Sequence, residues 1–533
     1  MNSFLGTIIR GSLAEGLTMR VDPQTDLEQL KTGKFVSIQS SNQRFFCLIT
    51  NITLEVTHPD ILLFPPGNHE TFLSKIVRSK DMYATAQLKP MLALTPEGKL
   101  SPVKTIPSHL AHVQDATKQD INLIFGNEQD KTKRYFSVGN PLDMDASVCI
   151  DLDKLTERSN GVFGKTGTGK TFLTRLVLSG LIHHDKAVSI IFDMHSEYGL
   201  QARKEGATGS FVKGLKTLFP DKIAIFSLDP DSTRRRGGSA DVELAVSYSS
   251  IAVEDIISLD GELNLNETAY EAAYLIAAKY KKKWLETLLS QGDSLKELAQ
   301  DVGAHPESIA ALYRKIKAIE KFPFLHKSTL SNDDVIDKMM EYIQKGTSII
   351  IEFGNYTSTL CYLLIANIIT RRLHSLYITK TERFLGTQRA GDEPKKLMIV
   401  IEEAHKFLNP QAARQTIFGT IAREMRKYYV SLLVVDQRPS GIDSEILSQI
   451  GTKIVAQLND EKDINAVLTG VAGAPQLRTV LAGLETKKQT LLLGHAIAMP
   501  IVIQTREYDE AFYSSVMRPF NVRTVDQLIQ DLF

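Results

Sequence analysis

The chain of 533 residues is 43% hydrophobic and 23% charged, a composition typical of a globular protein with a large core. It is too long for one ordinary domain, so we expect about two to four. Basic and acidic residues number 62 each, so bulk charge points to no partner. A basic channel inside an acidic exterior would give the same balance.

Targeting and membrane signals are not visible in the sequence. No apolar run reaches the ~18 residues of a membrane span, and the N-terminus lacks a basic region followed by an apolar one. Cys47, Cys149 and Cys361 are far apart and match no metal or redox spacing. We therefore expect a cytoplasmic protein with no membrane partner.

The first part of the chain, residues 1–110, is predicted to form a small N-terminal β-barrel. Short alternating segments, among them 5–9, 35–38 and 45–52, are broken by Gly, Asp-Pro and Ser-Asn turns. We expect a connector over 111–145, and loops at 65–68 and 118–133.

From about residue 145 strands alternate with helices, which indicates an α/β fold with a parallel sheet. We expect this core over 146–252 and 346–507, a helical insertion over 253–345 with helices over 267–288 and 308–321, and a C-terminal helical arm over 508–533. Strands are predicted at 187–193, 222–228, 347–353, 396–402, 430–436 and 452–458.

Residues Gly164 to Thr171 read G-x-x-x-x-G-K-T, the phosphate-binding P-loop. An apolar strand at 160–163 and a helix from 172 would flank it, so backbone N–H groups and a helix N-terminus would hold a polyphosphate. Lys170 would neutralise the β- and γ-phosphates, and the Thr171 hydroxyl would bind Mg²⁺. The expected nucleotide contacts are Gly164, Thr166, Gly167, Thr168, Gly169, Lys170, Thr171 and Phe172.

Two adjacent acids, Glu402 and Glu403, end the strand predicted at 396–402. Ligands of open α/β sheets collect at this carboxyl edge. Glu402 would approach Mg²⁺ through its water, and Glu403 would polarise the water that attacks ATP. The alternative is a pair of surface glutamates at a strand end.

Other polar groups follow neighbouring strands. Asp193 would lie near the metal or a water, and a loop cap is the alternative. Gln437 would reach the γ-phosphate or the attacking water, and a turn set by Pro439 is the alternative. Arg423 and Arg426 are candidates for an arginine delivered to the γ-phosphate of an adjacent subunit, with Arg158 a weaker one. A basic helix C-terminus, favoured by the helix dipole, is the alternative for the first two.

Together these segments resemble the HerA branch of the HerA/FtsK group of ring-forming ATPases. The resemblance rests on residues 161–171, 193–198, 401–405, 423–428, 437–440 and 493–496, with Pro500, and covers most of the chain. It implies a RecA-like P-loop core with a HerA–ATP-synthase (HAS) type barrel, and a homohexamer with ATP at its subunit interfaces. A central channel for double-stranded DNA and a partner, a NurA-like nuclease or an antiviral defence effector, are also implied.

The chain departs from the family at three positions. The family often has glycine where Met425 and Tyr429 stand, and Thr or Ser where Asp436 stands. Asp436 adds a negative charge beside Gln437.

DNA contacts are expected from a flexible basic loop at 231–238 or a helical basic cluster at 281–284, with solvated charged faces as the alternative.

The leading hypothesis is an ATP-driven translocase on double-stranded DNA. A second hypothesis is an ATP-regulated hexameric scaffold that controls an effector, either a nuclease or an NAD-consuming enzyme. A third is an ATPase that moves proteins through a secretion channel.

Overall fold

The computed structural model describes residues 4–63, 81–203, 211–327, 334–424, 427–471, 473–486 and 488–517. The chain divides into two compact units. Unit 1 comprises Met1–Leu155, Val162–Lys170 and Gly451–Glu507, and unit 2 comprises Thr156–Gly161, Thr171–Ile450 and Tyr508–Phe533. The loop expected at 65–68 lies outside the described residues.

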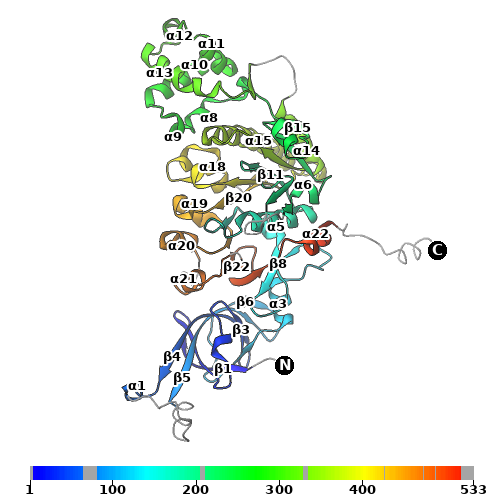
Figure 1. Ribbon diagram of the computed structural model, residues 1–533, viewed down its shortest axis with the longest axis vertical. Helices are drawn as coiled ribbons and strands as arrows, with labels where there is room; N and C mark the ends of the chain where they lie inside the picture. The colour runs from blue at the N-terminus through cyan, green and yellow to red at the C-terminus, as the bar shows by residue number, and fades with distance from the viewer. Residues whose placement is uncertain are drawn as a thin grey trace, which may run out of the picture. The chain divides into compact units, whose positions relative to one another are not determined.

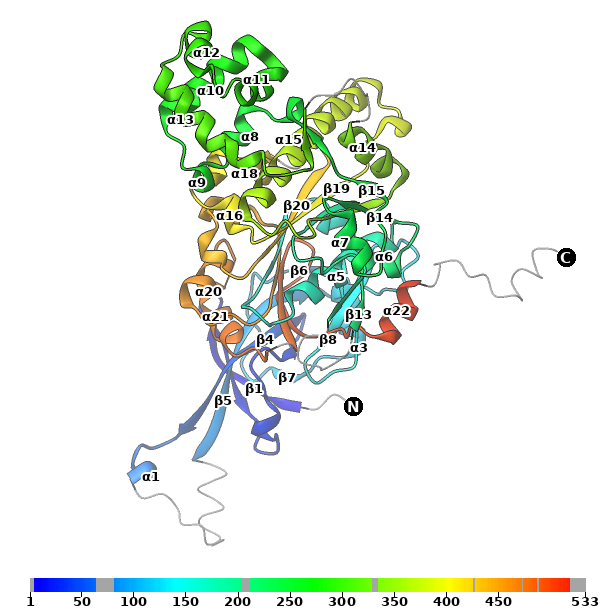
Figure 2. The same ribbon diagram turned by 45° about the horizontal axis from the view of Figure 1, so that its top comes forward.

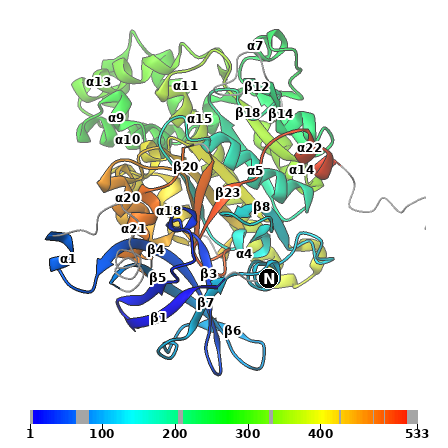
Figure 3. The same cartoon turned by 60° about the horizontal axis from the view of Figure 1, so that its bottom comes forward.

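Unit 1 begins with a closed antiparallel ring, shown in Figure 3, which confirms the predicted N-terminal barrel. The strands follow the order β2-β1-β7-β3-β4-β5, and β5 pairs with β2 to close the ring, while β6 (Leu100–Pro102) adds to β5. β4 and β5 run on beyond the ring as a two-stranded ribbon (Figure 2). The ring strands are β1 (Phe4–Ser12), β2 (Gly16–Val21), β3 (Phe35–Gln39), β4 (Arg44–Val56), β5 (Met82–Leu94) and β7 (His112–Asp115).

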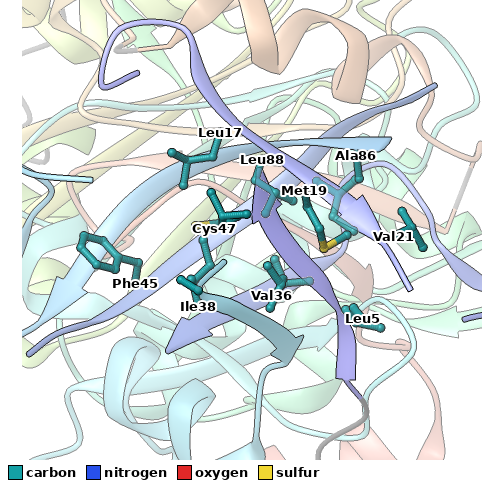
Figure 4. Close-up of a cluster of buried hydrophobic side chains, with 14 of the residues drawn as sticks. Leu5, Leu17, Met19, Val21, Val36, Ile38, Phe45, Cys47, Ala86 and Leu88 are labelled. Atoms are coloured by element: carbon teal, nitrogen blue, oxygen red, sulfur yellow. The ribbon is translucent and has the colours of Figure 1, made fainter. Parts of the chain in front are cut away.

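The interior of the ring is filled by alternate residues of its strands, because successive side chains of a strand point to opposite faces. Met19 and Val21 of β2, Val36 and Ile38 of β3 and Cys47 of β4 are buried in one apolar cluster (Figure 4). Burial raises the pKa of the Cys47 thiol, so this cysteine is an unreactive core residue.

The loop expected at 118–133 is partly wrong, since α3 (Lys118–Phe125) is a helix. The Thr117 hydroxyl accepts a hydrogen bond from the Asp120 N–H (3.1 Å), and the Asp120 carboxylate accepts one from the Thr117 N–H (2.7 Å). This reciprocal capping box supplies hydrogen-bond partners for backbone N–H groups at the start of the helix. The apolar face of the helix is buried through Ile121, Ile124 and Phe125. Polar residues that suggested a loop are therefore helix caps.

The remainder of unit 1 is an antiparallel arrangement in the order β21-β22-β23-β8-β9. β10 (Asn160–Phe163) ends in this unit, where the Phe163 carbonyl accepts from the Ala456 N–H (2.8 Å). Helices α20 (Glu461–Val467) and α21 (Ala474–Ala482) connect β21 to β22. The strands are β8 (Tyr135–Pro141), β9 (Val148–Asp151), β21 (Thr452–Val455), β22 (Gln489–Gly494) and β23 (Ile501–Thr505).

Unit 2 contains a parallel sheet in the order β15-β14-β18-β11-β19-β20, which confirms the α/β class. Its strands fall where the sequence predicts them, with the short edge strand β15 in addition. They are β11 (Val188–Asp193), β14 (Ile223–Ser227), β15 (Val242–Glu243), β18 (Ser348–Glu352), β19 (Leu397–Glu402) and β20 (Val430–Asp436). The long helices are α5 (Lys170–His183) and α15 (Thr359–Thr387).

The helical segment that precedes β18 gathers α10 to α13 in one cluster (Figure 1). The continuous helix expected over 267–288 is wrong, because α10 stops at Tyr280 and Lys281 adopts a positive φ of 53°. Trp284 begins the next helix, where it is buried and donates its indole N–H to the Ile251 carbonyl (2.8 Å). The helices are α8 (Val253–Ile257), α10 (Glu267–Tyr280), α11 (Trp284–Ser290), α12 (Leu295–Val302), α13 (Pro306–Ile316) and α14 (Val335–Lys345).

The flexible basic loop expected at 231–238 is also wrong. Residues Pro230–Arg235 form helix α7, capped by the Asp229 carboxylate on the Ser232 N–H (3.0 Å). Arg236 forms an ion pair with fully buried Glu352 (2.6 Å), so one of the three arginines is used inside the protein. At the C-terminus, α22 (Glu510–Met517) is helical, and residues 518–533 of the expected arm lie outside the described residues.

Candidate nucleotide site

The P-loop lies between β10 and α5, as the sequence predicts, and its glycines are sterically required. Gly167 and Gly169 have φ values of 77° and 89°, in the left-handed region that favours glycine. A Cβ atom on Gly164 would lie 2.6 Å from Thr168 Oγ1 and 2.9 Å from the Ala456 Cβ. At Gly164 neighbouring atoms are therefore so close that a larger residue would force the loop open.

Contacts inside the P-loop converge on one carbonyl. The Lys165 carbonyl accepts from the Thr168 N–H (3.3 Å), the Thr168 hydroxyl (2.7 Å) and the Lys170 ammonium (3.2 Å). The Lys165 N–H donates to the Gln457 carbonyl (3.0 Å). These bonds hold the loop in a closed turn with Thr166 exposed at its tip. The P-loop therefore has a shape fixed by its own hydrogen bonds.

Helix α5 has no acidic residue in its first turn, so no side chain of that turn competes with an anion for its N-terminus. The Thr171 hydroxyl donates to Glu197 Oε2 (2.9 Å). The ring of Phe172 lies 6.2 Å from the ring of Tyr508. Within unit 2, the start of α5 is therefore tied to the acidic turn that follows β11.

The carboxyl ends of β11, β19 and β20 lie at one edge of the sheet, because the parallel registers align them. Fully buried Asp193 accepts hydrogen bonds from the N–H groups of Glu197 (2.8 Å) and Tyr198 (2.9 Å). The Tyr198 hydroxyl donates to Glu402 Oε1 (2.9 Å). Tyr362 of α15 donates its hydroxyl to the Glu402 carbonyl and accepts from the Glu402 N–H, both at 3.1 Å. We call these side chains the acidic edge: Asp193, Glu197, Glu402 and Glu403.

Two carboxyl groups of the acidic edge have strongly raised pKa values. Burial raises the pKa of Asp193 to about 7, against the hydrogen bonds from Tyr198 and Glu197. Burial, and next the charge of Asp193, raises the pKa of Glu402 to about 8. Glu402 Oε2 is buried and has no hydrogen-bond partner among the described residues. A carboxylate in this state gains most from a nearby cation.

The residues at this edge fit Mg²⁺ bound together with a nucleotide. Within the described ranges no group of three or more His, Cys, Asp or Glu side chains forms a complete metal cage. Mg²⁺ commonly keeps several waters and takes one or two carboxylates together with substrate phosphates. The unpartnered oxygen of Glu402 and the hydroxyl of Thr171 match that pattern.

Glu403 is held at the turn after β19, with φ of 50°. Gln437 donates its amide to the Glu403 carboxylate (3.3 Å), so the structure brings these two predicted residues together. Buried Asp436 accepts from the His405 N–H (2.6 Å), the His405 ring (3.0 Å) and the Arg438 N–H (2.7 Å). Its charge is therefore engaged, and its hydrogen bond raises the pKa of His405.

The candidate arginines are not part of this hydrogen-bonded network in the described chain. Arg423, at the exposed end of α18 (Ile417–Glu424), donates to the Ala413 carbonyl (3.1 Å) and lies 3.8 Å from Glu445. Arg158 Nε is buried without a hydrogen-bond partner among the described atoms. Arg426 and Met425 lie outside the described residues.

Sequence reasoning missed the groups that hold the acids. Glu197 and Tyr198 stand four and five residues after Asp193, and their place in an acidic turn after a strand was a usable signal. Tyr362 lies 40 residues before Glu402 and has no local signal. His405 stands beside the two acids, but its partner Asp436 is 31 residues away.

Among the residues that the structure describes, no helix combines the length and the apolar character that crossing a membrane requires.

Comparisons of the sequence with known proteins point to the HerA helicases. Residues 136–373 match the family described as helicase HerA, central domain. The chain is 25% identical over 495 residues to the DNA double-strand break repair helicase HerA of Sulfurisphaera tokodaii, covering 90% of each chain. It is 23% identical to the HerA of Pyrococcus furiosus, over 78% of this chain and 77% of the relative. Among solved structures, VirB4 of Thermoanaerobacter pseudethanolicus is similar with a TM-score of 0.48 and 14% identity, over 71% of this chain and 98% of VirB4.

Proposed function

The chain belongs to the HerA helicase family, and from this premise we propose that it is a homohexameric motor that hydrolyses ATP to move double-stranded DNA. Relatives that cover nine-tenths of the chain carry the name of a DNA double-strand break repair helicase. The observation that carries the ATPase proposal is the P-loop closed on the Lys165 carbonyl, together with Glu402, whose buried Oε2 has no hydrogen-bond partner among the described residues.

We assign phosphate binding to the P-loop. The backbone N–H groups of Gly164 to Lys170 would hold the β- and γ-phosphates, and Lys170 would exchange its bond to the Lys165 carbonyl for a phosphate oxygen. Phe172, at the start of α5, would contact the nucleotide beyond the phosphates. The tight turn at Gly164 supports this assignment, because it leaves the loop narrow and rigid.

We assign hydrolysis to the acidic edge. Thr171 and Glu402 would hold Mg²⁺, with Asp193 acting through the turn that it caps. Bound Mg²⁺ would neutralise charge on the phosphates. Glu403 would polarise the attacking water, and Gln437, which already contacts the Glu403 carboxylate, would orient it and report the state of the γ-phosphate. Support comes from Glu403 being partly exposed while Glu402 is held by Tyr198 and Tyr362.

We further propose that an arginine reaches the γ-phosphate from an adjacent subunit. Arg423 is exposed at a helix end with one carbonyl and one distant carboxylate as partners, which leaves it able to exchange them. Arg426 and Arg158 are the other candidates. Lys281 to Lys283 are candidates for contact with DNA phosphates, since they lie on a short turn at a helix end.

We also propose that the ring works with a separate effector, a NurA-like nuclease or an antiviral defence enzyme. This part of the proposal rests on the family resemblance alone. A scaffold that controls such an effector without moving along DNA is the competing function.

The test combines ATP turnover with movement on DNA. We expect double-stranded DNA to raise ATP hydrolysis, and Lys170→Ala to abolish both hydrolysis and movement. Native mass measurement of the protein expressed with its neighbouring gene product would report ring size and partner together. Turnover that DNA does not change, with movement that survives Lys170→Ala, would end the motor proposal. An effector whose activity survives Glu403→Gln would support the scaffold.

A further inference from the structure

Arg175, on the buried face of α5, interacts electrostatically with the Asp193 carboxylate but forms no ion pair within 4 Å in the described part of the chain. Arg175 is 1% exposed, and its Nε and Nη1 atoms have no hydrogen-bond partner among the described residues. Nη2 donates to the Glu197 carbonyl. The guanidinium lies 5.5, 5.9 and 6.0 Å from the ring centres of Phe172, Tyr198 and Tyr508. Cation–π contacts compensate only part of the cost of burying such a charge.

The one hydrogen bond of Arg175 fixes the turn that supplies the acidic edge. Arg175 holds the Glu197 carbonyl, while Asp193 holds the Glu197 N–H (2.8 Å). The side chain of Glu197 reaches Thr171, and that of Tyr198 reaches Glu402. Arg175 is therefore one contact away from both groups proposed to bind Mg²⁺.

The aromatic rings around Arg175 include the start of the C-terminal segment, residues 508–517. The Tyr508 ring lies 5.0 Å from that of Phe512 and 5.1 Å from that of Tyr513. Lys213 anchors the same segment within unit 2. Its N–H donates to the Tyr513 hydroxyl (3.3 Å), and its ammonium lies 3.1 Å from Glu510. The C-terminal segment thus places the Tyr508 ring beside the Arg175 guanidinium, which bonds to the Glu197 carbonyl.

We propose that Arg175 is a positioning residue for the Glu197–Tyr198 turn, and that Tyr508 holds Arg175 in place, so docking of the C-terminal segment controls Mg²⁺ binding at the ATP site. This inference rests on the proposed ATPase function. It assigns the C-terminal segment a regulatory role within its own subunit, since any partner that lifts residues 508–517 would loosen the metal-binding groups.

The test measures metal binding in the full chain rather than turnover. The unfolding temperature of protein saturated with ADP is followed as Mg²⁺ is added, and Mn²⁺ binding is measured by electron paramagnetic resonance. We expect Arg175→Lys and Tyr508→Leu to raise the Mg²⁺ concentration at half-maximal effect by about tenfold, as changes around metal ligands commonly do. Lysine keeps the charge but lacks the planar fork. ADP affinity without metal should stay unchanged.

Two matched variants separate positioning from simple loss of stability. Tyr508→Phe keeps the ring and should retain the wild-type Mg²⁺ requirement. Tyr377→Leu removes another buried ring of unit 2, whose hydroxyl donates to the Lys395 carbonyl (3.0 Å). It should lower the unfolding temperature without changing the Mg²⁺ requirement.

An unchanged Mg²⁺ requirement in Tyr508→Leu would overturn the inference, as would an equal shift in Tyr508→Phe or in Tyr377→Leu. If Arg175→Lys does not fold, the Tyr508 pair decides. Wild-type protein that binds ADP and Mg²⁺ but hydrolyses no ATP would instead overturn the proposed function, leaving the metal-binding result to stand separately.

Discussion

The P-loop and the acidic edge are built in opposite ways. The P-loop is one continuous stretch whose shape comes from glycine geometry and from bonds to a single carbonyl, that of Lys165. The acidic edge is assembled from residues as far apart in the sequence as Asp193 and Glu403, and the hydroxyls of Tyr198 and Tyr362 and the amide of Gln437 hold its glutamates. A backbone-built loop can bind phosphate by itself, whereas the assembled edge depends on many distant contacts. Binding and hydrolysis should therefore respond to different mutations.

The largest expected effect separates these two activities. Glu403→Gln should lower kcat for ATP hydrolysis by about 10²–10⁴-fold, because the amide cannot accept a proton from water. ATP affinity should change little, since Glu403 is bonded to Gln437 and is assigned to the attacking water, whereas phosphate binding is assigned to the P-loop. Steady-state hydrolysis and binding of a fluorescent ATP analogue measure the two quantities. Loss of ATP binding with a normal kcat in Glu403→Gln would contradict the assignment of binding to the P-loop and of hydrolysis to the acidic edge.

Gly164→Ala should act in the other direction. The added Cβ would lie within 3 Å of two neighbours in the P-loop's surroundings, and overpacking of this kind costs about 1–3 kcal/mol. We expect nucleotide affinity to fall about tenfold or more. Gly386→Ala is the matched control, because Gly386, like Gly164, has no left-handed φ but has nothing within 4 Å of its Cβ position. It should leave nucleotide affinity unchanged, and an equal loss of affinity there would contradict the steric explanation.

The acidic edge should also show itself in the pH dependence of unfolding. The folded-state pKa of Glu402, about 8, is above its unfolded value, so the folded protein binds the extra proton. The free energy of unfolding therefore falls as pH rises between about 5 and 8, by about 1.4 kcal/mol per pH unit for one proton. Denaturant titrations should give a less negative slope for Glu402→Gln. An unchanged slope would mean that Glu402 is ionised in the folded protein.

The same contrast explains what could be predicted from the sequence. The P-loop, its strand and its helix are adjacent in sequence, so a local motif predicts them. The parallel strands were predicted because each one is a run of apolar residues. Which acids sit at strand ends was predictable as well. Their surroundings were not, because Tyr362 and Asp436 reach Glu402 and His405 only through the fold.

Polar residues that cap helices were mistaken for loop residues. Residues 118–125 and 231–235 were expected to lie in loops, yet Thr117 and Asp229 cap helices there. The opposite error occurred at Lys281, where a continuous helix was expected and a turn with positive φ follows α10. Trp284, which follows that turn, is buried and bonded to the Ile251 carbonyl, a contact that sequence periodicity does not reveal.

The smallest expected effect tests how far the acidic edge tolerates change. His405 lies 3.8 Å from Glu403 and is bonded to Asp436, so it connects the proposed base to a buried charge. His405→Gln keeps a polar side chain and should lower kcat only about threefold to tenfold, about 0.7–1.4 kcal/mol. Because Asp436 raises the pKa of His405, the wild-type protein gains stability from this pair at low pH and loses it as pH rises through the folded-state pKa. The variant should lack that loss. A decrease in kcat as large as that of Glu403→Gln would place His405 among the groups that act on water. Hydrolysis would then depend on the residues that hold the acidic edge as strongly as on its carboxylates.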